Sequence, residues 1–452
     1  MMEDNNTQLI INARVIDGAG QAPFDGAIAV QGNRILSVGA EPRVREAVGP
    51  GAEVVDVAGA TVMPGLIDSH CHVTFDEPQS NDELFFHRRA GLGALVASVN
   101  AQKVLRAGFT SLFDADCIFD VGVDLRDAIE AGVVQGPRMT TGGNVLINCV
   151  GGTASRLLPD RGRRGYGMIV HTRDEIVTEI HRQIKTGVDW IKVHVSGMPI
   201  RPHGHEGEIQ TWTLDELKLV CDTAHQLGVP VVGHCRNASS VRDAALAGFD
   251  MILHATNMDE HAVRAVIDHR VPLVPTFTFQ ANLADYGSAI GADPRLQEIF
   301  REEIVQSADT LSEVFKAGVP ILVGSESGFS LTPYGHWHYR ELKILQTYLG
   351  MTALEAIQSA TQHGAISLRA EGALGCLAEG YLADLIAVEG DVLDDLDVLG
   401  RPGAITRIMK DGRWVDTTKP LPSEWSIPGW RLSEFSGEVL TRSRAESAMG
   451  PL

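Results

Sequence analysis

Residues 64–72 read PGLIDSHCH, and the apolar residues that precede the two histidines predict a buried strand. Side chains on an extended strand repeat with a period of two, so His70 and His72 would leave the same face. Two neutral imidazoles on one face can chelate a metal ion, and imidazole suits Zn, Co, Ni, Fe or Cu. The segment therefore predicts a strand that ends in a metal-binding pair.

Length and charge narrow the class of protein. The chain has 452 residues, 44% of them hydrophobic, which is enough for one large domain and a smaller one. Its 38 Lys and Arg against 58 Asp and Glu give a formal charge of −20. This acidity disfavours nucleic acid and anionic membranes as partners, because both attract basic surfaces. We expect a small-molecule substrate and assembly only with copies of the same chain.

Targeting signals and cysteine spacing point to the cytoplasm. No apolar run reaches the ~20 residues that span a bilayer, and the acidic N-terminus is not typical of a signal peptide. Six scattered cysteines form no C-x-x-C pair. We therefore expect a cytoplasmic protein with reduced thiols and no disulfide framework.

The pattern from residue 64 to 365 is alternation of short apolar strands with amphipathic stretches. One amphipathic stretch opens with Thr213 and Glu216, a capping box. The expected strands are 109–113, 190–195, 230–234, 251–254, 272–275 and 321–324. Alternation of this kind is typical of a parallel α/β fold, and a (β/α)8 TIM-type barrel takes ~250 residues. A doubly wound sheet is the alternative, but no G-x-G-x-x-G follows a first strand.

The two ends of the chain have a different character. Residues 1–63 contain short β runs separated by turn signals such as Gly32-Asn33, and β runs return in residues 366–416. We expect these two segments to pair in one small β-sandwich beside the barrel. Residues 417–452 are rich in Pro, Ser and charge, and we expect an extended C-terminal arm.

Four further residues of the right chemistry lie in or just after predicted strands. They are Lys192, His234, His254 and Glu326. Catalytic groups of a barrel gather at the C-terminal ends of its strands. Each residue has a simpler explanation, since a histidine can be structural, Lys192 can face outward and Glu326 can cap a helix. Their shared position at the ends of separate strands favours one common site.

The motifs along the chain carry a resemblance to a known family. They are Val62–His72, Gly108–Ser111, Gly136–Arg138, Asp189–Lys192, Gly233-His234 and Gly375 through Gly380 to Leu385. In these the chain resembles the amidohydrolase superfamily, in its prolidase-like and imidazolonepropionase-like branch. The resemblance covers residues 8–416. It implies a (β/α)8 barrel with a β-sandwich built from both chain ends.

The resemblance also implies a metal centre. His70 and His72 would bind the more buried ion, and His234 and His254 the second. Lys192 would be carboxylated and bridge the two ions, since a carbamate oxygen can ligate a cation and an ammonium cannot. Zinc is the first expectation, with Co, Mn or Fe as alternatives and one or two ions bound.

Two positions depart from the family pattern. The family places Asp where this chain has Glu326, so whether this longer side chain ligates the metal stays open. As general base, Glu326 would take a proton from water and return it to the leaving amine, with His254 as ligand or electrophile. Relatives often have a histidine at the position of Thr153, so a donor to the substrate carbonyl is missing or replaced.

Loop residues near the expected site are candidates for substrate binding. They are Thr153, His203, His205, Arg236, Tyr334, His336 and Trp337. The Gly-Ser-Glu-Ser-Gly motif and the aromatic, histidine-rich loop after it resemble phenylurea and molinate (thiocarbamate) hydrolases. We expect hydrolysis of an amide, urea or carbamate C–N bond. The alternatives are an N-acyl amino acid or dipeptide hydrolase, including one acting on amide mycotoxins, and a catalytically impaired metal-binding protein.

Overall fold

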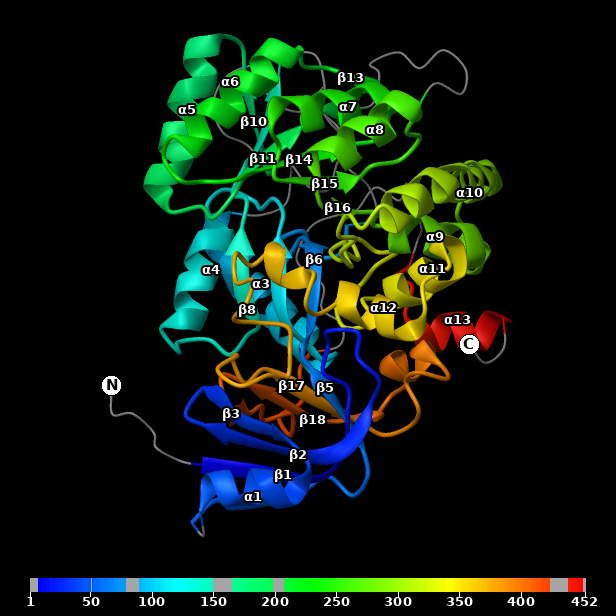
Figure 1. Cartoon of the computed structure of the whole chain (residues 1–452). Coiled ribbons are helices and arrows are strands. Elements are labelled where there is room, and N and C mark those ends of the chain that lie inside the picture. Colours follow the sequence, from blue (N-terminus) through cyan, green and yellow to red (C-terminus); the bar gives the residue numbers. More distant parts are fainter. Residues whose placement is uncertain are drawn as a thin grey trace.

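The computed structural model places a parallel-stranded α/β body beside a sheet made from both chain ends (Figure 1). It describes residues 7–49, 51–78, 89–148, 165–197, 207–422 and 438–449. The candidates Thr153, His203 and His205 lie outside the described residues. Among the described helices, none is both long and apolar enough to cross a membrane.

Parallel strands form the centre of the α/β body. Three pair in the order β6 (Leu66–Cys71), β7 (Phe109–Asp114) and β8 (Arg138–Thr141). Six more pair in the order β10 (Gly167–Val170), β9 (Val145–Asn148), β11 (Ile191–His194), β14 (Val231–Cys235), β15 (Met251–His254) and β16 (Leu273–Val274). A short antiparallel pair, β12 (Ser196–Gly197) and β13 (Ile209–Gln210), follows β11. The parallel α/β class predicted from the sequence is confirmed.

Residues 321–324 were expected to be a strand, and this is wrong in part. Only an isolated bridge joins Ile321 to Leu273 of β16. The segment divides its hydrogen bonds between two neighbours, because Leu322 N donates to Leu273 O at 2.8 Å and Ser69 N donates to Val323 O at 2.8 Å. It thus links the six-stranded sheet to β6 without a ladder of its own, and the described strands do not form one closed sheet.

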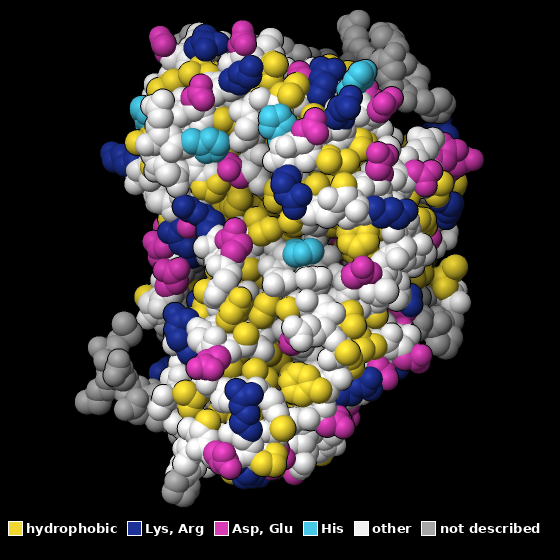
Figure 2. All heavy atoms as spheres, viewed as in Figure 1, with side chains coloured by type: hydrophobic (Ala, Val, Ile, Leu, Met, Phe, Trp, Pro, Cys, Tyr) yellow, Lys and Arg dark blue, Asp and Glu magenta, His cyan; other side chains and the backbone are white. Residues whose placement is uncertain are grey.

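Helices surround these strands. They are α3 (Ala90–Arg106), α4 (Val121–Glu130), α5 (Arg173–Thr186), α6 (Leu214–His225), α7 (Ala238–Ala247), α8 (Glu260–His269), α9 (Thr278–Tyr286), α10 (Pro294–Lys316), α11 (Arg340–Leu349) and α12 (Ala353–Ser359). The capping box predicted at the start of α6 is confirmed, since Thr213 accepts from Glu216 N and Glu216 accepts from Thr213 N. Figure 2 shows acidic and basic side chains interspersed on one face of the molecule.

Both chain ends contribute to one eight-stranded sheet. Its order is β19 (Arg413–Trp414), β18 (Ile405–Lys410), β17 (Leu385–Val388), β5 (Thr61–Pro64), β1 (Thr7–Val15), β2 (Phe24–Gln31) and β3 (Arg34–Gly39), with β4 (Glu53–Asp56) beside β1. The hairpin predicted at Gly32-Asn33 is confirmed, because Gln31 pairs with Arg34. Helix α1 (Glu41–Val48) packs on this sheet through Val44. The pairing shows one sheet, and the second layer of the expected sandwich stays a prediction.

The C-terminal segment is not only an extended arm. Residues 442–449 form helix α13 (Arg442–Met449), and Leu440 just before it is fully buried. Trp337 Nε1 donates to Leu440 O at 2.6 Å, and Leu440 N donates to Ser330 O at 3.0 Å. The sequence did not predict this packing, because composition records polarity but not which apolar residues, here Leu440 and Ala445, are buried against the body.

A core inside the α/β body contains residues from both parallel sheets. Phe113, Trp190, Val232, Leu253 and Leu322 belong to one buried cluster. Trp190 is 2% exposed, and its Nε1 donates to Ser367 O at 2.9 Å. The cluster therefore fixes the strands whose ends carry the candidate site.

Replacement of Trp190 by alanine should lower stability by ~3–5 kcal/mol, because it leaves a large cavity and removes a donor to Ser367. Thermal unfolding followed by circular dichroism would show an earlier midpoint. Val133→Ala, at a position 77% exposed, is the control and should unfold like the parent chain. Equal midpoints for the Trp190 variant and this control would contradict the assigned core.

Candidate metal centre

Three predicted residues converge on one point. The ligand atoms of His70, His72 and Glu326 all lie within 4.8 Å of one another. His70 is in β6, His72 follows its last residue, and Glu326 comes from the turn after residues 321–324. Within the described residues this is the group of His, Cys, Asp and Glu side chains that could hold an ion.

The remaining predicted ligands surround this group. The His254 ring centroid lies 5.2 Å from that of His70 and 4.5 Å from that of His234. His254 Nε2 lies 3.9 Å from Glu326 Oε1. Lys192 is 1% exposed in β11, which pairs with β14, the strand of His234, and β14 in turn pairs with β15, the strand of His254. The structure thus brings together the side chains that the sequence nominated as ligands.

Glycine at position 324 allows the Glu326 turn to pass close to His70. A Cβ atom added there would lie 2.7 Å from His70 Cβ and 2.5 Å from Val274 Cγ1. Glu326 N also donates to His70 O at 2.7 Å. Any larger residue at 324 would separate the two ligand-bearing segments.

A buried hydrogen-bond network holds the same two segments together. Asp68 Oδ1 accepts from His70 N at 3.1 Å and from Ser325 N at 3.0 Å. Asp68 Oδ2 accepts from Ser325 Oγ at 2.5 Å and from His338 Nδ1 at 2.7 Å. These side chains are buried, so the network is shielded from water. The sequence analysis did not nominate Asp68 or His338, although Asp68 lies in the opening motif.

Two of the candidate ligands, His254 and Glu326, have an unusual backbone conformation. His254 has φ +68° and Glu326 has φ +54°, both in the left-handed region. Non-glycine residues there cost ~1–3 kcal/mol and persist where surrounding contacts enforce them. Such positions cluster at functional sites, which agrees with the placement of both side chains beside His70.

Two acidic residues that sequence reasoning missed contact the histidines. Asp116 Oδ1 lies 2.6 Å from His72 Nδ1, and Asp116 Oδ2 lies 3.5 Å from His194 Nε2. Glu208 Oε2 accepts from His234 Nε2 at 2.8 Å. Asp116 follows β7, so the strand-end argument could have found it. His194 lies two residues after Lys192 and so had the same period-two signal as the opening pair.

Burial sets the protonation of the histidines and of Lys192. Burial lowers the pKa of His70 and of His254 well below the ordinary value, so both rings are neutral. It opposes protonation of His72 too, but the Asp116 carboxylate outweighs it and the pKa of His72 is raised. Burial also lowers the pKa of Lys192, against the opposing effect of Asp116.

The pKa values of the carboxylates of Glu326 and Glu208 are shifted in opposite directions. Burial raises the pKa of Glu326 above the ordinary value, although His72 and Arg236 oppose it. For Glu208 the effect of burial is outweighed by His234, and its pKa falls to about 2. Glu208 is therefore ionised, and Glu326 is the more basic of the two.

The donor set fits a divalent metal ion. Both ring nitrogens of His254 are buried and have no hydrogen-bond partner among the described residues. Buried imidazoles normally find partners, and an ion is one partner that neutral imidazole accepts. His70 Nδ1 contacts Thr276 Oγ1 at 2.9 Å, which leaves its other ring nitrogen for the centre.

The predicted substrate-binding residues have other contacts. Tyr334 Oη donates to His72 O, so it holds the backbone beside a candidate ligand. Trp337 is fully buried against Tyr286 and holds the C-terminal segment. The prediction of a pocket-lining Trp337 is wrong, because aromatic packing turns its ring away from solvent.

The remaining two candidates also lie in other environments. Arg236 is paired with Glu303, with Nη2 and Oε2 2.5 Å apart, and is stacked over Phe300. Its guanidinium group is therefore already occupied and is not available to bind a substrate carboxylate. Burial lowers the pKa of His336 to about 4, and the neighbouring groups that lower it further are Lys103 and His338 rather than the metal ligands.

Comparison with known proteins places this geometry in a family. Residues 61–415 match the amidohydrolase family. The chain belongs to that family. It is therefore a hydrolase acting on C–N bonds, and the resemblance inferred from the sequence is confirmed.

Individual relatives align with almost the whole chain. Ochratoxinase of Aspergillus niger is 26% identical over 436 residues, or 91% of this chain and 87% of the relative. The crystal structure of a Xaa-Pro dipeptidase with bound methionine is 28% identical, covers 91% of this chain and 100% of its own, and has a TM-score of 0.76. Phenylurea hydrolase B has a TM-score of 0.73 at 22% identity, with 94% and 100% covered, which supports the fold alone.

Gly324→Ala should weaken metal binding by the amidohydrolase at least ~10-fold, because the added methyl group forces His70 away from Glu326. Elemental analysis of dialysed protein would report the ions retained per chain. Gly51→Ala, where an added Cβ meets nothing within 4 Å, is the matched control. Undiminished metal content in Gly324→Ala would show that the close approach does not position the ligands.

Proposed function

We propose that this amidohydrolase uses a bound divalent metal ion to hydrolyse the C–N bond of a small-molecule amide, urea or carbamate. The observation that carries the proposal is the convergence of His70, His72 and Glu326 within 4.8 Å. Family membership supplies the reaction class, and the buried, uncharged His254 supplies a further donor.

The cation is proposed from the donor types. Imidazole and carboxylate ligands suit zinc first, with Co, Mn or Fe as alternatives. His70, His72, His234 and His254 would hold one or two ions, with a carboxylated Lys192 in the two-ion form. When bound, such an ion supplies Lewis acidity, which lowers the pKa of water and polarises a carbonyl group.

Glu326 is the proposed proton carrier. Its carboxylate lies in the ligand group, and its raised pKa brings it closer to the pH at which a general base works best. It takes a proton from the attacking water and gives it to the leaving nitrogen, so that no net proton is gained by the protein. His254 acts beside it as a ligand or as a donor to the carbonyl oxygen.

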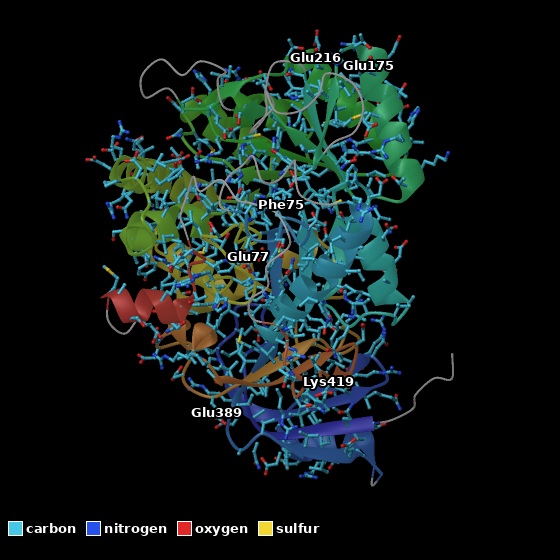
Figure 3. The ribbon with its side chains drawn as sticks, turned by 180° about the vertical axis from the view of Figure 1, so that it is seen from behind. Phe75, Glu77, Glu175, Glu216, Glu389 and Lys419 are labelled. Atoms are coloured by element: carbon cyan, nitrogen blue, oxygen red, sulfur yellow. The ribbon has the colours of Figure 1, made fainter. Side chains whose placement is uncertain are left out.

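An aromatic wall next to the ligands points to the substrate class. We define this wall as Phe75, Tyr166, Phe279 and Phe329, all less than 10% exposed. Phe75 stacks on His72 with ring centroids 4.3 Å apart, and it lies near the middle of the molecule in Figure 3. Aromatic side chains favour aromatic and apolar ligand groups. We therefore propose an aryl or similarly apolar substituent close to the scissile bond, as in phenylurea-like or thiocarbamate-like compounds.

A second candidate is an N-acyl amino acid or dipeptide hydrolase, including one acting on amide mycotoxins. Similarity to ochratoxinase and to a Xaa-Pro dipeptidase favours it. The pairing of Arg236 with Glu303 speaks against it, because a free substrate carboxylate needs an available cation. A panel of aryl ureas, aryl amides and N-acyl amino acids would separate the two.

The parallel strands of the α/β body also allow a proposal about its architecture. We propose that a (β/α)8 barrel closes from eight strand positions: β6, β7, β8 continued by β9, β11, β14, β15, β16 and residues 321–324, with β10 outside the barrel as an edge strand beside β9. This is supported by the hydrogen bonds that Leu322 and Val323 make to opposite neighbours and by the core shared between the sheets.

Glu326→Gln should retain bound metal but lower kcat roughly 10²- to 10⁴-fold, because the amide cannot accept a proton. Steady-state assays of the zinc- and cobalt-loaded forms, beside elemental analysis, provide both readouts. Glu326→Asp keeps a carboxylate and should retain part of the activity. Parent-like rates in the Gln variant would remove Glu326 as the base, and no turnover by the parent chain despite bound metal would favour an impaired metal-binding protein.

Phe329→Ala should raise KM for an aryl amide or aryl urea ~5- to 30-fold, which corresponds to ~1–2 kcal/mol of lost contact. KM for an N-acetyl amino acid with a small side chain should change much less. Phe24→Ala, on the distant sheet and 38% exposed, is the control. Equal changes for both substrate types would argue against the aromatic wall as the specificity element.

A further inference from the structure

The C-terminal segment, residues 438–449, is fastened to the loop that follows Glu326. Leu440 N donates to Ser330 O at 3.0 Å, and Trp337 Nε1 donates to Leu440 O at 2.6 Å. Leu440 is fully buried, and a buried backbone needs partners for both its N–H and its C=O group. It finds both of them in this loop, so one residue near the C-terminus holds two points of the loop.

Ser330 of this loop is held from two sides. Its N donates to Pro78 O at 3.2 Å, and its O accepts from Leu440 N. Pro78 lies three residues after Phe75, and Ser330 directly follows Phe329. The rings of these two phenylalanines, both members of the aromatic wall, have centroids 5.4 Å apart. The backbone contacts of Ser330 therefore join the C-terminal segment to the segments that carry two rings of the wall.

The side chain of Leu440 belongs to the same apolar cluster as the wall. One buried cluster contains Leu440, Ala445 and all four residues of the aromatic wall. The Phe329 ring in that cluster lies with its centroid 6.1 Å from that of His72. Interiors are close-packed, so the loss of one side chain shifts its neighbours or leaves a cavity. A change at Leu440 can therefore reach the ring beside a candidate metal ligand.

Helix α13, red in Figure 1, has an attachment of its own. Arg442 is 5% exposed, its Nη1 donates to Tyr339 Oη at 2.8 Å, and its guanidinium lies over the Tyr339 ring at 5.5 Å from the centroid. Arg442 Nε also donates to Glu446 Oε1 at 2.8 Å within the helix. This contact fixes the position of α13 independently of Leu440, so the segment stays docked when the Leu440 side chain is shortened.

We propose that Leu440 is a positioning residue for substrate recognition, which fixes Ser330 and thereby holds the Phe329 ring in the aromatic wall. The inference rests on the proposed function, because it takes the wall as the surface that receives an aryl group of the substrate. The metal ligands then determine which bond is cleaved, and the C-terminal segment determines how well an aryl substituent is bound.

The alternative is that the C-terminal segment only stabilises the fold. Leu440→Ala shortens the side chain, and Leu440→Met keeps its volume and should behave like the parent chain. Met449→Ala is the matched control, since Met449 lies in the same segment and is 59% exposed. Trp337→Phe is a second test variant, because it removes the donor to Leu440 O and keeps a ring to pack on Tyr286.

The experiment measures binding of aniline and of methylamine, the amines released from aryl and from methyl amides, by NMR titration of the full-length chain. Leu440→Ala and Trp337→Phe should bind aniline ~3- to 10-fold more weakly, with methylamine binding unchanged. KM for acetanilide should rise by the same factor, and kcat should stay near that of the parent chain. Thermal unfolding shows that each variant folds.

A double-mutant cycle tests whether Leu440 acts through Phe329. In a Phe329→Ala background, Leu440→Ala should change aniline binding less than ~2-fold, because the ring that it positions is already absent. The full effect of Leu440→Ala in that background would overturn the proposal.

Equal weakening of both amines by Leu440→Ala would also overturn it and leave the segment a stabilising element. So would a parent chain that binds aniline no better than methylamine. A parent chain that hydrolyses no amide, urea or carbamate would instead refute the proposed function. The amine titrations need no turnover, so they decide the role of Leu440 in that case too.

Discussion

The buried carboxylate of Asp68 is the interaction on which the candidate site depends. Burying an unpaired carboxylate costs several kcal/mol, so its oxygens need donors. The backbone amides of His70 and Ser325 bind one oxygen, and the Ser325 hydroxyl and His338 bind the other. These donors come from segments more than 250 residues apart in the chain. Satisfying one charge therefore fixes the first ligand strand against the turn that carries Glu326.

The buried cluster around Asp68 contains both neutral imidazoles and ionised carboxylates, although burial favours the neutral form of each. Burial keeps the imidazoles of His70 and His254 neutral, which is the form that can ligate. The same burial would also neutralise carboxylates, yet Asp116 and Glu208 stay ionised because each contacts a histidine. Neutral nitrogen donors and negative oxygen donors thus coexist in one buried cluster, which is a composition that suits a divalent cation.

The sequence predicted the parts of the site that depend on local periodicity. His70 and His72 could be paired because strand side chains alternate, and His234, His254 and Glu326 because they end or follow apolar runs. Glu208 could not be found this way, since its place depends on a short strand pair whose geometry is tertiary. Residues 321–324 resembled a strand but share their hydrogen bonds between two neighbours. Position in a loop near the expected site was also an insufficient guide for Trp337, whose ring packs against Tyr286 and the C-terminal segment.

The eight-stranded sheet has a consequence for biosynthesis. Strand β5, at residues 61–64, pairs on one side with β1 and on the other with β17, at residues 385–388. While the ribosome makes the roughly 320 residues between them, one edge of β5 has no partner of its own. Exposed edges recruit foreign strands, so the nascent chain passes through a long interval of vulnerability to aggregation. Slow translation would lengthen that interval, and high expression would raise the number of exposed edges present at one time. Chaperones that cover sheet edges would protect the chain during it.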